Sequence, residues 1–256
     1  MFCNQFLISQ HSDESCAPRK FSSTRRIHFE DQKEDYVLKS FLYRWGKRLI
    51  DVYARLMFRM DIQGRIPLPD GPKIIVANHP SITDPFLVMM LLREQVSILI
   101  HETLFHVPVF GAYLRHIGHV PVLINNGRTA FEQAQDLLKN GRSIVIFPEG
   151  GISPLDGGFH LPRTGAARLA LTTGAPVIPF GIHLERSRIR LIETKVKGKT
   201  ETGKWYLRGP YAITVGTAMR FDGDVEDRPH VRSVSRRIME SIIALSQHSA
   251  QRMGFA

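Results

Sequence analysis

Short apolar runs alternate with longer, periodic segments through the central part of this chain. The runs are rich in Val and Ile and are bounded by Gly, Pro or polar residues, which predicts buried strands at residues 73–77, 96–100, 119–124, 143–147 and 176–182. The intervening segments predict helices at residues 86–93, 129–140 and 164–173, and a helical connection at residues 101–118. Alternating strands and helices predict an α/β fold with a mostly parallel sheet flanked by helices.

The pattern changes after residue 186, where β-rich stretches joined by a glycine-containing turn predict an antiparallel edge of the sheet. Lys195, Lys197 and Lys199 alternate along this edge near Trp205. These lysines either protect an edge strand against pairing with another chain or form a docking surface for an anion. A helix at residues 231–247 is expected to close the domain.

Residues 34–60 place apolar side chains at helical spacing, with Lys and Arg interleaved. Gly46 allows a bend, so we expect an amphipathic pair of shorter helices. A basic helix with Trp, Tyr and Phe on its apolar side is suited to the membrane interface, and the alternative is a core-packing helix with a solvated basic face. No run of about 18 apolar residues occurs, so no segment is predicted to span a bilayer.

Composition places the chain among ordinary globular proteins, with 256 residues of which 43% are hydrophobic and 23% charged. We expect a disordered tail at residues 1–33, amphipathic helices at residues 34–62 and one domain at residues 63–252. Cys3 and Cys16 both lie in the tail and cannot cross-link a core, which favours a reducing compartment. The net charge of +10 indicates an anionic partner, such as a membrane surface, an acyl carrier protein, a nucleotide-bearing cofactor or nucleic acid.

The turn after the first central strand carries the chain's most informative chemistry. His79 follows residues 73–77, and Asp84 with Pro85 has the signature of a helix start. Open α/β sheets bind ligands at the carboxyl ends of their strands. A carboxylate beside an imidazole can fix its tautomer and leave the other nitrogen free to take a proton. The neutral interpretation is a helix-capping Asp near an unrelated loop His.

Three further segments strengthen the functional interpretation of His79. The strand at residues 143–147 runs into Pro148 and Glu149, so Glu149 is expected at the same rim as His79. Residues 176–179 form a strand with a proline at each end, which requires special backbone hydrogen bonding. Residues 125–128 form a turn that presents the guanidinium of Arg128. The order and spacing of these segments are hard to explain by structural needs alone.

Together these segments resemble the glycerolipid acyltransferase family, the 1-acylglycerol-3-phosphate O-acyltransferases and their relatives. NHPSITD at residues 78–84 matches the family's N-H-x-x-x-x-D block, and IVIFPEG at residues 144–150 resembles its F-P-E-G block. APVIPFGI at residues 175–182 resembles the V-P-V-x-P block. LFHVPVFGAYLRHIG at residues 104–118 resembles the connector before the second block. The resemblance covers about residues 40 to 220.

The resemblance implies transfer of a fatty acyl group from a thioester to a hydroxyl of a glycerophospholipid precursor such as lysophosphatidate, with no metal or other cofactor. His79 is then the general base and Asp84 its partner. The implied donor is acyl-CoA or an acyl-carrier-protein thioester, and the N-terminal helices are a peripheral anchor on the cytoplasmic face of a membrane. The implied acceptor-side residues are Asn78, Phe147, Pro148, Glu149 and Gly150, and the implied acyl-donor side is Val177, Ile178 and Pro179.

Two departures from the family pattern concern the acceptor phosphate. Relatives supply arginine where this chain has Ile124 and Ile152. A phosphate taken out of water needs a bidentate guanidinium or a helix N-terminus, so Arg128 or Arg163 is expected to take over. The alternative is an acceptor lipid without a phosphate.

Other functional classes fit the motifs less well. A non-catalytic lipid- or carrier-protein-binding module has no need of a His–Asp pair. A metal hydrolase built on His101, His106, His116 and His119 lacks a matching set of carboxylates. The basic residues are dispersed without a nucleic-acid recognition motif, and the G-x-S-x-G of a nucleophile-elbow hydrolase does not occur. Nothing in the pattern specifies an oligomeric state.

Overall fold

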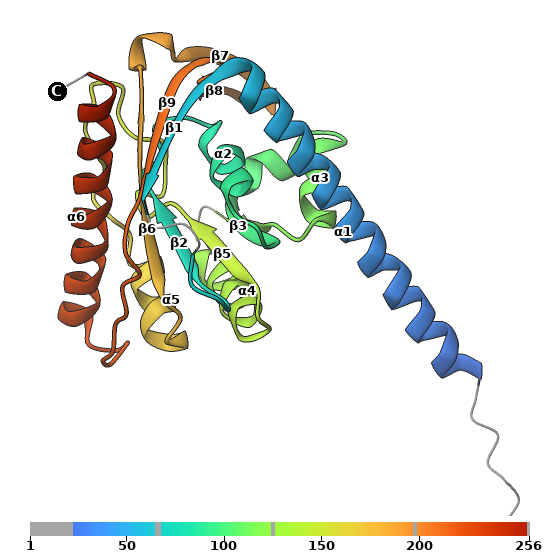
Figure 1. The fold of residues 1–256 in the computed structure, drawn as a ribbon. Helices are drawn as coiled ribbons and strands as arrows, with labels where there is room; N and C mark the ends of the chain where they lie inside the picture. The colour runs from blue at the N-terminus through green and yellow to red at the C-terminus, as the bar shows by residue number, and fades with distance from the viewer. Residues whose placement is uncertain (1–22, 65–67, 124–125, 197–198, 255–256) are drawn as a thin grey trace, which may run out of the picture. The chain divides into compact units, whose positions relative to one another are not determined.

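The computed structural model describes residues 23–64, 68–123, 126–196 and 199–254 (Figure 1). Within these residues seven strands form one sheet in the order β1-β9-β6-β2-β5-β3-β4. All neighbouring strands are parallel except β6 and β9. The predicted α/β class with a mostly parallel sheet is therefore confirmed. The strands are β1 (Phe58–Gly64), β2 (Ile74–Ala77), β3 (Val96–His101), β4 (Val120–Val122), β5 (Ser143–Ile146), β6 (Val177–Leu184) and β9 (Gly209–Val215).

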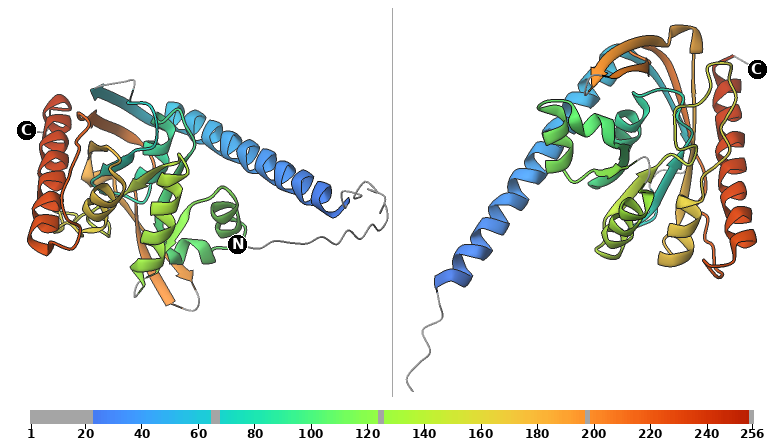
Figure 2. Two further views of the ribbon diagram at one scale, coloured as in Figure 1. Left: turned by 90° about the horizontal axis from the view of Figure 1, so that it is seen from below. Right: turned by 180° about the vertical axis from the view of Figure 1, so that it is seen from behind.

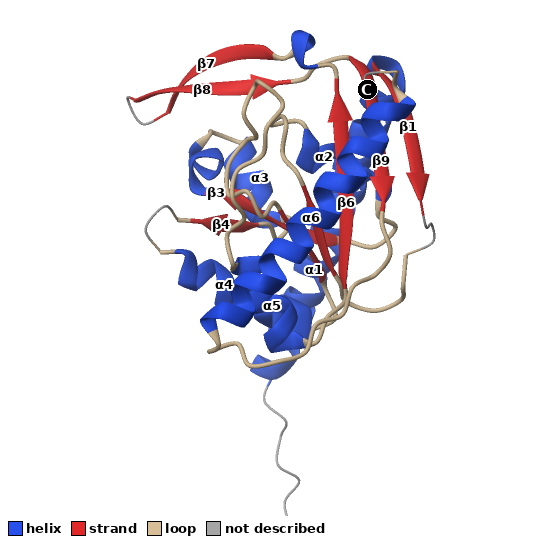
Figure 3. Cartoon of the chain, turned by 90° about the vertical axis from the view of Figure 1, so that its left-hand side faces the viewer, coloured by secondary structure: helices blue, strands red, loops and turns tan. Residues whose placement is uncertain are grey.

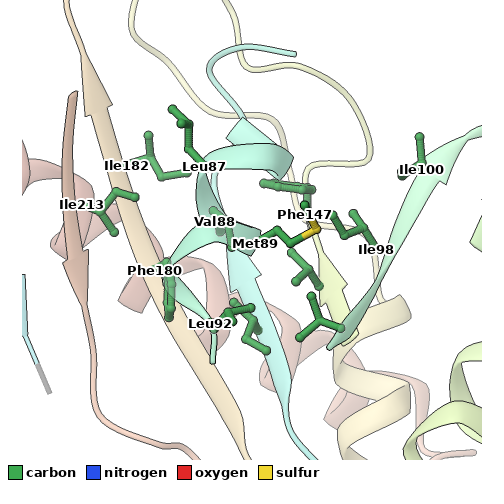
Figure 4. Close-up of a cluster of buried hydrophobic side chains, with 14 of the residues drawn as sticks. Leu87, Val88, Met89, Leu92, Ile98, Ile100, Phe147, Phe180, Ile182 and Ile213 are labelled. Atoms are coloured by element: carbon green, nitrogen blue, oxygen red, sulfur yellow. The ribbon is translucent and has the colours of Figure 1, made fainter. Parts of the chain in front are cut away.

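Helices cover both faces of the sheet (Figures 1 and 2). One face carries α2 (Asp84–Leu91) and α3 (Phe110–His116), joined by residues of α1 (Ser23–Met57) in one buried cluster. Figure 4 shows part of this cluster, in which Leu87, Val88 and Met89 pack against the strands. The other face carries α4 (Gly127–Lys139), α5 (Gly165–Thr173) and α6 (Arg228–Arg252).

The composition of β2 follows from its position between these two clusters. All four of its residues are fully buried. Ile75 and Ala77 enter the first cluster while Ile74 and Val76 enter the second, because successive side chains of a strand point to opposite faces. A short, wholly apolar run is what such a strand requires. His79 lies just beyond its carboxyl end.

The C-terminal strands differ in part from the prediction of an antiparallel edge. Strand β9 is antiparallel to β6, but it is not the edge, because β1 pairs with it in parallel. Residues 58–60, predicted as helix, belong to β1. The stretches β7 (Arg190–Val196) and β8 (Lys199–Trp205) leave the main sheet and form their own antiparallel pair, preceded by the short helix η2 (Arg186–Arg188) (Figure 3). The side chains of residues 195–199 lie outside the described part, so the role of their lysines stays a prediction.

The N-terminal helix α1 is continuous, which corrects the prediction of two helices with a bend at Gly46. Gly46 instead permits a close approach, because a Cβ atom there would lie 1.8 Å from the Tyr113 hydroxyl oxygen. Residues 23–33 belong to α1, and residues 1–22, with both cysteines, lie outside the described residues, so the disordered tail stays a prediction. Residues 39–256 form one compact unit and the chain before residue 39 another. None of the described helices is both long and apolar enough to cross a membrane.

Candidate active site

The turn between β2 and α2 brings His79 and Asp84 into contact. Asp84 is the first residue of α2, and Thr83 occupies the N-cap position without a side-chain capping bond. His79 Nδ1 lies 3.1 Å from Asp84 Oδ2, so the contact expected from the sequence is present. Asp84 is fully buried, whereas the His79 side chain is 15% exposed. The imidazole is therefore the part of the pair that a substrate can reach.

Asp84 is held by four hydrogen-bond donors around its carboxylate. Its Oδ2 accepts from the Ser81 amide at 2.7 Å as well as from His79, and its Oδ1 accepts from the Ser81 hydroxyl at 2.8 Å. Its Oδ1 also accepts from the Tyr211 hydroxyl at 2.8 Å. Burial, followed by the charge of Asp84, raises the pKa of Tyr211 well above its ordinary value, so this hydroxyl remains a donor. These bonds stabilise a buried carboxylate in its charged form.

The same contacts decide which ring nitrogen carries the proton when His79 is neutral. An ionised carboxylate only accepts hydrogen bonds, so Nδ1 carries the proton and Nε2 keeps its lone pair. The imidazole ring stacks on Phe147, with ring centroids 4.2 Å apart and an interplanar angle of 25°. Stacking and the carboxylate together fix the orientation of the ring. The pair can therefore act as a general base through Nε2.

Glu149 connects the loop after β5 to the turn that carries His79. Its Oε1 accepts from the His79 amide at 3.0 Å and from the Ser153 hydroxyl at 2.6 Å, and its Oε2 accepts from the His160 amide at 2.9 Å. The Ser153 amide donates in return to the His79 carbonyl at 2.7 Å. Glu149 is only 4% exposed. Its bond to the His79 amide places it at the same rim as His79, as expected, and its other bonds join two loops there.

Several residues that the resemblance assigned to substrate have other contacts in the structure. The Asn78 side chain donates to the Ile182 carbonyl and accepts from the Ile182 amide, at 2.8 and 2.7 Å, so both amide atoms join β2 to β6. Val177, Ile178 and Pro179 are buried in the sheet, and Val177 pairs with Ile74 at the opposite end of β2 from His79. That these three residues line the acyl-donor side therefore stays a prediction, and it requires an acyl chain that reaches buried side chains of the sheet.

The two arginines proposed for the phosphate lie in different places. The side chain of Arg128 is 87% exposed and paired with Glu132 on α4, which follows the edge strand β4. Strand β4 is three strands from β2, or about 14 Å. Arg163 lies beside the Pro148–Gly150 segment: its amide donates to the Pro148 carbonyl at 2.8 Å, and a Cβ at Gly150 would lie 2.2 Å from its Nε. Ile124 lies outside the described residues.

Sequence reasoning missed the residues that complete the site from distant segments. Ser81 could have been suspected, because a Ser three residues before an Asp in a turn commonly bonds to it. Tyr211 gives no such signal, since 127 residues separate it from Asp84. Lys204 and Arg186 were also missed. They donate to the carbonyls of Ser153 and Pro154 in the loop that Glu149 holds.

The four histidines of the metal-hydrolase alternative do not gather at one point. His101 accepts from the Thr103 amide before η1 (Glu102–His106), and His106 bonds to the Glu102 carbonyl. His119 accepts from the Ile98 amide, and burial, followed by the charge of Arg142, lowers its pKa to about 4. Across the described ranges, no three His, Cys, Asp or Glu side chains are grouped to hold a metal ion.

Comparison with known proteins gives a consistent result. Residues 59–183 match the family model described as Acyltransferase. A chloroplastic 1-acyl-sn-glycerol-3-phosphate acyltransferase of Brassica napus is 32% identical over 51% of this chain and 38% of its own length. A 1-acyl-sn-glycerol-3-phosphate acyltransferase of Pseudomonas aeruginosa is 29% identical over 48% of each chain. The chain thus spans about half, or less, of the length of these curated relatives.

A solved structure shares the fold. The crystal structure of a 1-acyl-sn-glycerophosphate acyltransferase from Thermotoga maritima aligns with a TM-score of 0.58 and 22% identity, over 85% of this chain and 82% of that one. The helix-flanked, mostly parallel sheet, with its His–Asp pair at the end of a central strand, thus has the α/β fold of that acyltransferase structure. More specifically, residues 59–183 match the Acyltransferase family model, and the chain resembles relatives named 1-acyl-sn-glycerol-3-phosphate acyltransferases.

Proposed function

We propose that this protein transfers a fatty acyl group from a thioester donor to the hydroxyl of a lysophosphatidate-like acceptor. One observation carries the proposal: His79 is oriented by a buried Asp84, which four donors hold, and its other ring nitrogen is left to accept a proton. Acyl-CoA or an acyl-carrier-protein thioester is the donor, and no cofactor takes part. The names of the curated relatives support the acceptor class.

The proposed reaction needs one base and no protein nucleophile. His79 Nε2 takes the proton of the acceptor hydroxyl as the oxygen attacks the thioester carbonyl carbon. The charge of Asp84 stabilises the imidazolium. The tetrahedral intermediate then collapses with cleavage of the C–S bond, and the thiolate leaving group recovers the proton from His79. General-base assistance contributes about 10²–10⁴-fold in rate, and holding both substrates together contributes further.

A panel of acceptors tests this function. Purified protein is mixed with a long-chain acyl-CoA, or with the corresponding acyl-carrier-protein thioester, and with lysophosphatidate, monoacylglycerol or an aminolipid. We expect thiol release together with a product whose mass equals lysophosphatidate plus one acyl chain. Product from monoacylglycerol but not from lysophosphatidate would support the unphosphorylated alternative, which the isoleucine at position 152 favours. Thiol release with no acceptor-dependent product would contradict acyl transfer.

We also propose that α1 lies on the cytoplasmic face of an anionic membrane as a peripheral anchor. Phe41, Trp45, Leu49, Val52 and Leu56 recur at helical spacing, and each is between 47% and 75% exposed. Exposed cations of the same helix, including Arg44, Arg48 and Arg55, suit contact with anionic headgroups. The opposite side of the helix supplies Tyr43 and Ala54 to the core, so core packing accounts for that face, and the exposed face is the one that we propose for the membrane.

Replacing Leu49 and Leu56 together with aspartate is expected to lower binding to vesicles containing phosphatidylglycerol by about tenfold or more, because two leucines no longer enter the interface. Wild-type binding is expected to fall with added salt, since charges are screened beyond about 10 Å at 0.1 M. Co-sedimentation measures both effects. Leu191→Asp on β7, which is 58% exposed, is the matched control. Equal sedimentation of the wild type and the double variant would exclude this face as the anchor.

A further inference from the structure

The segment that contains η2 and β8 is tied to the turn that carries His79. The Ile82 amide donates to the Lys204 carbonyl at 2.8 Å. The Thr83 hydroxyl donates to the Tyr206 carbonyl at 2.9 Å and accepts from the Tyr206 amide at 3.3 Å. These bonds hold the backbone of β8 against a turn from which it is separated by more than a hundred residues of sequence. Side chains of this segment are therefore positioned at the candidate active site.

Two cations of this segment donate hydrogen bonds to neighbouring carbonyl groups in the loop that follows Glu149. Lys204 Nζ donates to the Ser153 carbonyl at 3.0 Å, and Arg186 Nη1 donates to the Pro154 carbonyl. The amide of Ser153 itself donates to the His79 carbonyl at 2.7 Å. Both positive charges are thus fixed to a loop that is one hydrogen bond away from the turn of the proposed base.

Neither cation has a carboxylate partner within ion-pairing distance among the described residues, and both are half-buried. Burial lowers the pKa of Arg186, while the negative charges of Glu149, Asp156 and Asp84 act in the opposite direction. A half-buried guanidinium with unused donors is well suited to bind an anion.

Arg188 provides a contrast on the same short helix. It is exposed and forms an ion pair with Glu185. Arg186, two residues earlier, faces the loop at the site, and among the described residues its side chain donates one hydrogen bond, to the neutral carbonyl of Pro154. The burial of the two side chains and the groups that they face therefore distinguish Arg186, which can contact a substrate, from Arg188, which is ion-paired at the surface.

We propose that Arg186 and Lys204 bind the phosphate of the acceptor lipid and replace the arginine that relatives carry at the position of Ile152. This inference rests on the proposed acyl transfer to a phosphorylated acceptor. The planar guanidinium can donate two parallel bonds to phosphate oxygens, and the ammonium adds a second positive charge. Because both cations are anchored to the loop that bonds to the His79 backbone, the bound phosphate would bring the acceptor hydroxyl of the same small glycerol unit to Nε2.

The test compares Arg186→Gln, Lys204→Gln and the double variant with the wild type. Glutamine keeps a donor for the loop carbonyl but removes the charge. We expect each single variant to raise the KM for lysophosphatidate about 10- to 100-fold, because a charged hydrogen bond is lost, and to leave the KM for the thioester unchanged. The rate with monoacylglycerol, which has no phosphate, should not fall. Arg188→Gln is the matched control and should behave as the wild type.

A purely structural role predicts a different result, namely an equal loss of kcat with both acceptors, and that result would overturn the assignment. Calorimetric binding of a short-chain lysophosphatidate, used below its micelle concentration, separates this inference from the proposed reaction. Binding that is lost in the double variant supports the phosphate site even if no acyl transfer is detected. Equal binding by the wild type and the double variant, or no binding by the wild type, would contradict it.

Discussion

Replacement of His79 with alanine is expected to lower kcat for acyl transfer by about 10²–10⁴-fold, the usual contribution of a general base. The fold should persist, because Asp84 keeps three of its four donors, two from Ser81 and one from Tyr211. The measurement is thiol release at saturating concentrations of both substrates, with circular dichroism and the thermal midpoint recorded on the same samples. A folded His79→Ala protein that retains more than about one tenth of the rate would contradict the mechanism.

The direct contacts of His79 make this test specific. The imidazole stacks on Phe147, and its side chain remains 15% exposed, so alanine removes a reactive group without opening a deeply buried cavity. The peptide groups of His79 bond to Glu149 and Ser153 through the backbone, and these bonds survive the substitution. Loss of activity without loss of structure is therefore the expected signature.

Replacement of Asp84 with asparagine is expected to lower kcat by a comparable factor, about 10²–10⁴-fold. An asparagine oxygen can still accept from His79 Nδ1 and the Ser81 amide if its NH₂ group faces the hydroxyls of Ser81 and Tyr211, which can rotate to accept. The orientation of the ring is then kept, but the charge that stabilises the imidazolium is lost. The thermal midpoint should change little, because the substitution removes the cost of burying a charge together with the favourable contacts of that charge.

Tyr211→Phe is the matched control for this prediction. It removes one of the bonds to Asp84 but keeps the negative charge, so kcat should fall by no more than about tenfold, consistent with about 1 kcal/mol for one hydrogen bond. If Asp84→Asn instead lowers the thermal midpoint and spares kcat, Asp84 is only a structural residue at the start of α2. The ratio of the two effects thus separates an electrostatic role from a structural one.

The local parts of this site could be predicted because the relevant signals lie within a few residues of each other. A short apolar run, a turn and an Asp-Pro helix start place His79 and Asp84 on the same turn, whatever the rest of the chain does. The strand ending at Pro148-Glu149 gives the same kind of information for a neighbouring strand. Alternation of strands and helices then predicts that both ends meet at one rim of a parallel sheet.

The same local signals were misleading where another segment determined the outcome. Gly46 was expected to allow a bend, yet α1 is continuous, and the missing side chain of the glycine leaves room for the Tyr113 hydroxyl. Residues 58–60 continue a helical pattern, but pairing with β9 makes them a strand. Pro176 and Pro179 were expected to require special backbone hydrogen bonding, and their carbonyls accept from the amides of Ile74 and Gly216 inside the fold.

The sequence alone therefore determined the fold class and the His79–Asp84 contact, because periodicity and turn chemistry act over distances of a few residues. Only the tertiary structure decided which distant groups surround that pair. Tyr211 reaches Asp84 from a strand far along the chain, while Arg186 and Lys204, rather than the exposed Arg128, come to the adjacent loop. The physical reason is that a cationic side chain can bind an anion only where its burial and its neighbours allow it. Burial and neighbours depend on the strand order and on the path of β8, which no short stretch of sequence encodes.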